Sequence, residues 1–372
     1  MLKLHVVQAE EGDCLILEFG TESNARHILV DGGPAQIYRR HLRGELRKIK
    51  ERGGRLDLVI LSHVDDDHVA GLLDLMTEVR EQRDRHVAEM IKMNALWHNA
   101  FSQTIGRDND IQARLEMRLA AAGTARRIMT MTDAVALSIR QGDELRSAAQ
   151  GLDIPINAGF PNDLISVDGA PHQPVKLGGL RLYVVGPTES SLRELKKKWI
   201  KWLREAKDRR LAVSASLASK VDSSIPNLSS IMLVAEMKGK RVLLAGDGLS
   251  DHLIRGLGQA NLLGSDGTLH VDVLKVPHHG SIRNIRKKEF FKTVTADKYV
   301  ISANGRDGNP DLTTLTWIVR AAKEQGRSIE ILTTNETAST KQLAKKYNED
   351  DYGYRLHRMK KGSHSMTLQI AD

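Results

Sequence analysis

The sequence predicts an α/β fold of the α+β type, in which strands and amphipathic helices build one large domain. Three observations support this prediction. Residues 2–7, 14–19 and 26–31 run apolar or alternate between apolar and polar positions, with turns between them, as neighbouring strands do. Residues 36–52 then place apolar side chains at helical spacing. In the second half, strand-like and helical runs alternate again, and an apolar content of 41% over 372 residues is sufficient for a large core.

Local signals delimit the elements of the first hundred residues. Paired glycines permit a sharp turn after the third strand. The apolar run from Leu56 to Leu61 predicts a buried strand. We expect a helix that opens at Gly71 and continues to about Arg85, and then a short strand around residues 91–97.

The middle of the chain has a different amino-acid composition. Residues 100–175 are rich in Ala, Arg, Met and Gln at helical spacing, and they end in a stretch rich in Gly, Pro and Asp. A strand at 179–186 and a charged helix at 188–210 are expected next. We interpret residues 100–225 as a mostly helical insertion into a single domain that spans 1–372, and as a candidate surface for a protein partner or a lid over substrate.

The second half returns to strands joined by short turns. Lys238 and Gly239 form a hairpin signal between two apolar runs. The tail from Tyr352 to Ile370 is expected to form a final hairpin. The other expected strands are 230–237, 240–245, 271–276, 298–303 and 328–333, with helices at 250–257 and 311–325.

Composition limits the classes of site and partner. A single cysteine, Cys14, excludes a disulfide framework and cysteine-rich zinc sites. The net charge of +8 and the basic runs at 189–210 and 283–288 indicate an anionic substrate, such as nucleic acid or a nucleotide. No run approaches the roughly 18 apolar residues of a membrane span, and the N-terminus lacks the apolar region of a signal peptide. We therefore expect a cytoplasmic protein with no membrane partner.

The strongest chemical signal lies between His63 and His68, where two histidines and three aspartates occupy six positions directly after the buried strand. Carboxylates beside an apolar core are costly unless a cation compensates them. Residues two positions apart on an extended segment point to one side, as His63 and Asp65 would. Asp67 and His68 follow where the chain turns, whereas Asp66 is expected to face solvent or to support its neighbours. This arrangement is typical of a metal site.

Metal-competent residues also follow two later strands: Asp247 within 246–248, and His278 with His279 after 271–276. Each of these short motifs is a weak signal alone, but their joint occurrence at carboxyl ends of strands is a strong one. With them the chain resembles the metallo-β-lactamase superfamily. Within it, the His-x-Asp-x-Asp-His order and the Val-Pro-His-His-Gly-Ser run are most similar to the hydrolase domain of the DNA-uptake competence proteins of the ComEC type.

The resemblance implies an αββα sandwich with two divalent metal ions at one edge between its sheets. It also implies hydrolysis by a metal-activated hydroxide, in which His278 donates a proton to the leaving oxygen. His279 is favoured over His278 as the metal ligand, and Asp31 is expected to orient the ligand loop. The implied site residues are His63 and Asp65 for one ion, Asp67, His68 and His279 for the other, Asp247 as the bridge between them, and Asp67, Asp247 and His278 as catalytic residues.

Two departures from the family pattern affect the metals. Asp65 replaces the commoner second histidine, and this oxygen-richer site adds Mn²⁺ and Mg²⁺ to Zn²⁺ as candidate ions. Secondly, no histidine follows the strand that ends at residues 185–188, so the first ion lacks a third protein ligand. His98 and His172 are the candidates for that position.

Three functions are compatible with these residues. The leading hypothesis is a metal-dependent phosphodiesterase, most plausibly a nuclease, because the motifs and the basic runs agree with it. The second keeps the fold and exchanges the substrate for a small ester, lactone or lactam, since one fold hosts many reactions. The third is a non-catalytic, partner-binding subunit, which the missing third-motif histidine favours.

Overall fold

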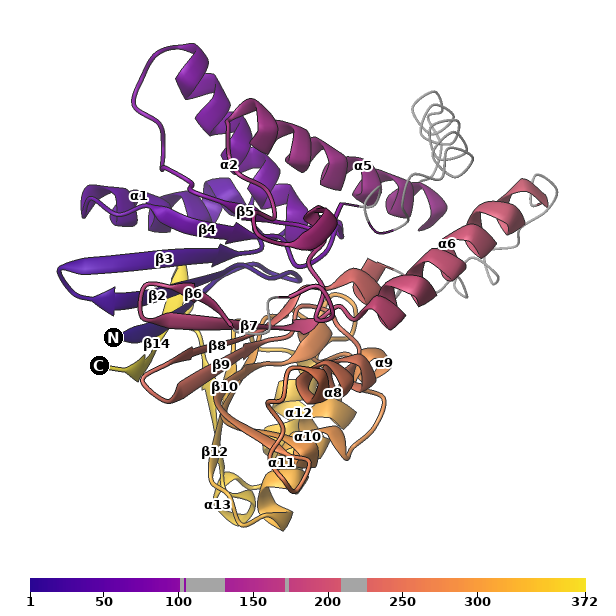
Figure 1. Ribbon diagram of the computed structural model, residues 1–372. Coiled ribbons are helices and arrows are strands. Elements are labelled where there is room, and N and C mark those ends of the chain that lie inside the picture. The colour runs from indigo at the N-terminus through magenta and orange to yellow at the C-terminus, as the bar shows by residue number, and fades with distance from the viewer. Residues whose placement is uncertain (101–103, 105–130, 171–173, 209–225) are drawn as a thin grey trace.

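The computed structural model describes residues 1–100, 104, 131–170, 174–208 and 226–372 (Figure 1). Two β-sheets face each other, and helices cover the outer face of each sheet. The fold is therefore the α/β sandwich with αββα layers that the sequence predicted. The two chain termini lie side by side at one end of the sandwich (Figure 1).

The first sheet combines an antiparallel meander with two parallel strands. Strands β1, β2 and β3 pair antiparallel in chain order, and β4 and β5 then join parallel. The last strand of the chain pairs antiparallel with β1 and completes the other edge. In spatial order the strands are β14 (Ser365–Ala371), β1 (Leu2–Val7), β2 (Leu15–Thr21), β3 (Asn24–Val30), β4 (Leu56–Ile60) and β5 (Leu96–Trp97).

The second sheet also combines an antiparallel half with a parallel half. Strands β9 to β13 are parallel neighbours, and β6 to β9 pair antiparallel. The hairpin predicted at Lys238 and Gly239 is confirmed. In chain order the strands are β6 (Val175–Leu177), β7 (Leu180–Gly186), β8 (Met232–Met237), β9 (Lys240–Leu244), β10 (Leu269–Lys275), β11 (Val294–Ile301), β12 (Ile329–Thr333) and β13 (Tyr354–Arg358).

The prediction of a hairpin in the C-terminal tail is wrong. β13 pairs parallel with β12 in the second sheet, whereas β14 pairs with β1 in the first. The two strands serve different cores, because Tyr354 packs beneath the helices of the second sheet and Leu368 packs between the sheets. The alternation of apolar residues in the tail is compatible with either arrangement, so it could not distinguish them.

Helices cover both outer faces. On the first sheet lie a π-helical turn (Tyr38–Leu42), α1 (Arg43–Glu51), α2 (Asp66–Asp84) and α5 (Met131–Gly151). On the second lie α8 (Ser250–Gln259), α9 (Ile282–Ile285), α10 (Phe290–Thr293), α11 (Leu312–Glu324), α12 (Ala338–Lys346) and α13 (Glu349–Tyr352). The far end of α6 (Glu189–Asp208) extends away from the layers, as Figure 1 shows. Within the described ranges, no helix combines the length and the apolarity that crossing a bilayer requires.

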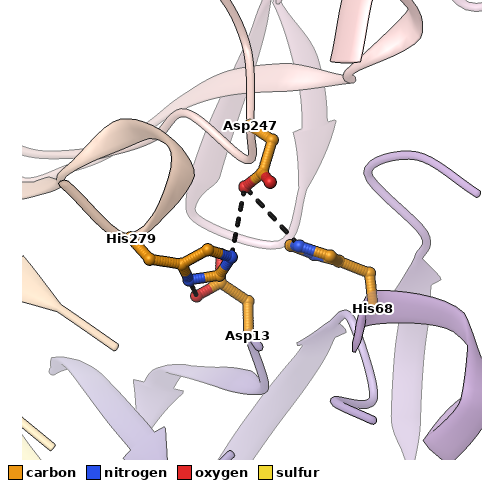
Figure 2. A group of neighbouring side chains, drawn as sticks. All are labelled: Asp13, His68, Asp247 and His279. Atoms are coloured by element: carbon orange, nitrogen blue, oxygen red, sulfur yellow. Dashed lines mark ion pairs between the residues drawn. The ribbon is translucent and has the colours of Figure 1, made fainter. Parts of the chain in front are cut away.

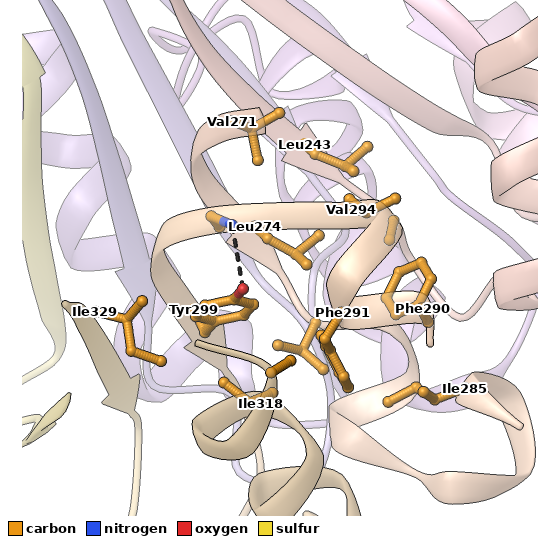
Figure 3. Packing of buried hydrophobic residues seen from close by; sticks show 14 of the residues in the cluster. Leu243, Val271, Leu274, Ile285, Phe290, Phe291, Val294, Tyr299, Ile318 and Ile329 are labelled. Atoms are coloured by element: carbon orange, nitrogen blue, oxygen red, sulfur yellow. Dashed lines mark hydrogen bonds between the residues drawn. The ribbon is translucent and has the colours of Figure 1, made fainter. Parts of the chain in front are cut away.

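Three apolar cores hold these layers together. One fills the space between the sheets, and the other two lie beneath the helices. Figure 3 shows the core of the second sheet, where Phe290, Phe291 and Tyr299 pack edge to face. Full burial of each such side chain contributes on the order of 1.5–3 kcal/mol. The Tyr299 hydroxyl is not left unsatisfied, since it accepts from the Ala296 N–H at 3.1 Å.

The described parts of residues 100–225 contribute to the sandwich itself. β6 and β7 extend the second sheet, and α5 buries Leu145 and Ala149 in the core that also contains Leu72 of α2. The remaining residues of this range lie outside the described part of the chain. An insertion over the whole range, within a single domain, stays a prediction.

Candidate metal centre

The candidate centre forms where β4, β9 and β10 end. β4 ends at Ile60, and α2 begins at Asp66, five residues earlier than the predicted start at Gly71. Asp65 is therefore the residue that precedes the helix, and Asp66 and Asp67 lie in its first turn. Carboxylates are favourable there because the helix N-terminus carries partial positive charge.

A close contact between backbones places this helix against the turn that follows β3. A Cβ atom at Gly71 would lie 1.9 Å from the Gly32 oxygen, so only glycine permits the approach. The Gly32 N–H also donates to the His68 carbonyl at 2.8 Å. The contact brings Asp31 to the His68 ring. The predicted role of Gly71 as a helix start is therefore replaced by one in packing.

The Asp247 carboxylate lies at the middle of the centre and presents one oxygen to each of two groups. Its Oδ1 lies 3.5 Å from His68 Nε2 and 3.6 Å from His279 Nε2 (Figure 2). Asp67 completes this first group, because its Oδ2 lies 3.5 Å from His279 Nε2 and 3.8 Å from His68 Nε2. We call His68, His279 and Asp67 the Oδ1 group.

The second group faces the other oxygen of Asp247. Asp247 Oδ2 lies 3.7 Å from His63 Nε2 and 3.6 Å from His278 Nε2. Asp65 Oδ2 lies 3.4 Å from His63 Nε2. We call His63, Asp65 and His278 the Oδ2 group. The structure thus brings together the site residues that the family resemblance implied, which are His63, Asp65, Asp67, His68, Asp247, His278 and His279.

The donor atoms of this centre fit divalent cations. His63 Nε2, His68 Nε2, His279 Nε2 and Asp247 Oδ1 are buried and have no hydrogen-bond partner among the described residues. Leaving several such atoms unpaired costs roughly 1–3 kcal/mol each, unless another species binds them. Ligands of a tetrahedral ion at about 2.1 Å lie roughly 3.4 Å apart. Because the separations within each group are 3.4–3.8 Å, the residues present fit one ion per group.

Hydrogen bonds behind three of the imidazoles fix their orientation. Asp31 Oδ2 accepts from His68 Nδ1 at 2.9 Å and from Ser62 Oγ at 2.7 Å. Ser302 O accepts from His279 Nδ1 at 2.8 Å. The Ser62 oxygen lies 3.0 Å from His63 Nδ1. Such partners turn each Nε2 toward the ions, and Asp31 has the supporting position that the sequence suggested.

The loop that carries the histidine pair has a strained backbone. His278 and His279 adopt φ values of 46° and 53°, in the left-handed region that non-glycine residues seldom occupy. The His278 N–H donates to the Gly246 carbonyl at 3.1 Å, and Asn284 Nδ2 donates to the Asp247 carbonyl at 2.5 Å. These bonds tie the loop to the turn after β9, so both rings point toward the Asp247 carboxylate.

Asp13, which lies between the first two predicted strands, also belongs to the centre, and it is not among the residues that the sequence predicted. It is 1% exposed, and its Oδ1 lies 3.5 Å from His279 Nδ1 (Figure 2). One ligand atom from each of Asp13, His68, Asp247 and His279 lies within 4.8 Å of the others. Asp13 also forms an ion pair with the fully buried Lys275 at the end of β10. A lysine at the end of an apolar strand requires an anionic partner, and this signal could have identified Asp13.

The carboxylates and imidazoles of the centre shift one another's pKa values. Burial opposes protonation of His279, but the Asp247 and Asp13 carboxylates outweigh it and raise its pKa to about 10. Burial also opposes protonation of His68, yet nearby carboxylates raise its pKa well above 6.5. Burial disfavours ionised Asp67, but His68 and His279 lower its pKa to about 2. The centre therefore attracts cations, whether protons or metal ions.

His98, one candidate for the missing third ligand, does not join the centre. His98 is buried and its Nε2 donates to the Gly142 carbonyl at 3.2 Å, and within the described residues no contact links it to the ligands. Burial lowers its pKa to about 4. His172 lies outside the described residues. Asp66 is exposed, as predicted, and accepts from Gln141 Nε2 at 2.7 Å.

Comparison with known proteins supports the fold. Residues 10–133 match the metallo-beta-lactamase superfamily, a range that includes Asp13, Asp31 and the 63–68 cluster. No curated protein matches the chain. A solved structure described as a new diphosphatase from the PhnP family aligns with a TM-score of 0.40 and 10% identity, covering 100% of this chain and 98% of that one. The closer similarity to the ComEC type stays a prediction. The similarity to the metallo-beta-lactamase superfamily thus covers residues 10–133, and the αββα sandwich is consistent with it.

Proposed function

We propose that this chain is a metal-dependent hydrolase that cleaves phosphodiesters, with nucleic acid or a nucleotide as its substrate. The observation that carries the proposal is the convergence of unpaired, buried ligand atoms from three strand ends on the two oxygens of Asp247. Zn²⁺, Mn²⁺ and Mg²⁺ are the candidate ions, because histidine nitrogens and carboxylate oxygens are both present.

The protein side chains divide the work of hydrolysis. Bound divalent ions would lower the pKa of a coordinated water and stabilise negative charge that develops on the substrate. His68, His279 and Asp67 would hold one ion, His63 and Asp65 the other, and Asp247 both. Asp67 is 31% exposed and lies at the surface of the centre, where it can orient the attacking water. His278 lies beside Asp247 Oδ2 and can present a proton to the leaving oxygen.

Basic side chains next to the histidine loop favour a phosphate-containing substrate. Arg283, Arg286, Lys287 and Lys288 follow His279 by four to nine positions, and all four are exposed. Positive charge beside the centre would attract a polyanion and raise its local concentration. This feature favours a phosphodiester over a neutral ester, lactone or lactam.

A substrate panel on matched variants tests the proposal. The purified protein, loaded with Zn²⁺, Mn²⁺ or Mg²⁺, is assayed on single-stranded DNA, RNA, bis(p-nitrophenyl) phosphate and p-nitrophenyl acetate. We expect phosphodiester cleavage that Asp67→Ala reduces at least about 100-fold, since removal of a supporting residue alone costs 10–100-fold. Asp66→Ala removes the adjacent exposed carboxylate and is the matched control. Cleavage of the acetate alone, or of nothing while metal is bound, would refute the proposal.

The basic run has its own test. The triple variant Arg286→Gln, Lys287→Gln, Lys288→Gln should weaken DNA binding and reduce its dependence on salt concentration. The control is Lys345→Gln with Lys346→Gln, which removes charge from α12 on the outer layer. Equal effects of the two variants would assign the binding to overall charge rather than to this run.

A location in the cytoplasm and a protein partner bound through residues 100–225 are also proposals. Fractionation of cells and cross-linking of the full chain would test them. Exposed residues of α5 would be substituted, and the capture of the partner measured again. Unchanged capture would exclude α5 as the docking surface.

A further inference from the structure

His278 differs from the other three histidines of the centre. Its side chain is 24% exposed, whereas those of His63, His68 and His279 are 3% exposed or less. It nevertheless lies as close to Asp247 as they do, with Nε2 at 3.6 Å from Oδ2. Position alone would therefore allow it to serve as the missing third ligand of the ion at the Oδ2 group.

The hydrogen-bond partners of the Nδ1 atoms distinguish His278 from the other three histidines. Asp31 and the Ser302 carbonyl are acceptors, so the Nδ1 atoms of His68 and His279 keep a proton, and Nε2 is the atom that each ring would offer to a metal ion in exchange for its other proton. Ser62 Oγ donates its own proton to Asp31, so it accepts from His63 Nδ1 in the same way. The partners of these three histidines therefore favour metal binding through Nε2.

His278 has a donor, not an acceptor, at this position. The Asn227 side-chain amide Nδ2 lies 3.2 Å from His278 Nδ1 and donates to it. Asn227 is 1% exposed, and its backbone is held because its carbonyl accepts from the Ser230 N–H at 3.1 Å. A ring that accepts at Nδ1 carries its proton on Nε2, and such an atom has no lone pair for a metal.

We propose that Asn227 is a positioning residue that holds His278 as an Nε2–H hydrogen-bond donor and keeps it from acting as a metal ligand. The donor then faces the space beside Asp247 Oδ2, where it can stabilise the leaving oxygen of a phosphodiester by a hydrogen bond. A ring that accepts at Nδ1 keeps this proton, so the leaving oxygen takes its own proton from water. His63, Asp65 and Asp247 would then hold an ion at the Oδ2 group, and such an ion would remain accessible to water and substrate, as catalytic sites require. The substrate part of this inference rests on the proposed function, whereas the tautomer does not.

Nitrogen NMR on histidine-labelled protein tests the tautomer directly. The full chain, loaded with Zn²⁺ and free of substrate, should show His278 with a lone-pair Nδ1 and a protonated Nε2, assigned by the signals lost in His278→Gln. Asn227→Asp places an acceptor beside His278 Nδ1, so the proton should move to Nδ1 and leave the lone pair on Nε2. Asn227→Ala removes the donor, avoids a new buried charge, and should give a mixture. Asn348→Asp, the same change at the N-cap of α13, should leave the ring signals unaltered.

Metal content and hydrolysis provide the second readout. We expect Zn²⁺ at the Oδ2 group to bind more tightly in Asn227→Asp, where Nε2 becomes available, and no more tightly in Asn227→Ala. Hydrolysis of a dialkyl phosphodiester should fall about 100-fold in kcat in Asn227→Ala, with KM little changed, as on loss of one transition-state donor. The loss should be smaller for bis(p-nitrophenyl) phosphate, whose leaving group needs less stabilisation.

The outcomes are distinguishable from those that test the function. A metal-bound or lone-pair Nε2 on wild-type His278, or identical ring signals in Asn227→Asp and wild type, would overturn the assignment. The expected ring signals in a protein that cleaves no phosphodiester would support the assignment and refute the proposed function.

Discussion

The two groups around Asp247 differ in how completely the chain builds them. The Oδ1 group has two fully enclosed imidazoles, and each is held from behind by a firm acceptor, the Asp31 carboxylate or the Ser302 carbonyl. The Oδ2 group has one enclosed imidazole, His63, backed by a serine hydroxyl. Its other members, Asp65 and His278, are 27% and 24% exposed.

This difference implies unequal metal affinities and unequal roles. More ligands and better-fixed rings strengthen the binding of an ion, so the Oδ1 group should hold its ion through purification. The Oδ2 group, with fewer ligands and one enclosed imidazole instead of two, should bind its ion weakly and exchange substrate oxygens. With both ions bound, the chain would combine a retained ion with one that is open to substrate.

Loss of Asp247 should abolish the difference in metal affinity, because both groups depend on its carboxylate. Asp247→Ala is expected to lower metal content from about two ions to near zero, and phosphodiester hydrolysis to background. Mass-spectrometric metal analysis after gel filtration measures the first effect. Asp251→Ala, four residues later on α8, is the control. Retention of one ion at full affinity would show that Asp247 does not bridge the groups.

Separate removal of one histidine from each group should expose the inequality. His68→Ala should lose the tightly held ion and weaken the other, because Asp247 loses part of its support. His63→Ala should lose only the weaker ion and retain about one ion per chain. Metal content and competition with a chromogenic chelator measure both variants. Equal losses would contradict unequal affinities.

How far the sequence predicts this centre depends on the distance over which each signal acts. The 63–68 cluster, Asp247 and the His278-His279 pair were predictable because each follows an apolar strand, and strand ends converge at one edge of a sheet. Asp13 was not, since its partners Lys275 and His279 are more than 260 positions away and only the facing of the two sheets brings them together. The start of α2 was misplaced for a similar reason: Gly71 marks a contact with Gly32, not a helix end.

The same limit explains the outcome for the tail and for the middle of the chain. Local alternation identified β13 and β14 as strands, but it does not state which sheet each one joins. In the same way, β7 was predicted as a strand within the proposed insertion, although its pairing with β8 makes it part of the second sheet. Pairing partners are fixed by cores that form between distant segments, so single-sequence patterns do not contain them.

Weakening the support behind one ligand should affect one group only. Asp31→Asn keeps the size of the side chain but removes the charged acceptor of the His68 Nδ1–H. Metal affinity of the Oδ1 group should fall about 10–100-fold, while that of the Oδ2 group changes little. Calorimetric titration of the metal-free protein with Zn²⁺ resolves the two sites. A uniform loss at both would mean that Asp31 supports the fold of the centre rather than His68 alone.

The pH dependence of metal binding should give the smallest and most specific effect. In the metal-free protein, carboxylates outweigh burial and raise the pKa of His279 from 6.5 to about 10, and that of His68 also rises. The stability that these protonated rings contribute is complete below pH 6.5 and is lost as the pH rises toward 10. Metal ions replace these protons, so binding at the Oδ1 group should release protons and tighten with pH.

Two measurements check this expectation. The melting temperature of the metal-free protein should decline between pH 7 and 9.5, whereas the metal-loaded protein should hold its value. Calorimetry between pH 6.5 and 8.5, in buffers of different ionisation enthalpy, should detect proton release on Zn²⁺ binding, and His68→Ala should release fewer protons. If the Zn²⁺ affinity and the proton release did not depend on pH, then His68 and His279 would not be protonated in the metal-free protein. The neighbouring carboxylates would then act only on the metal.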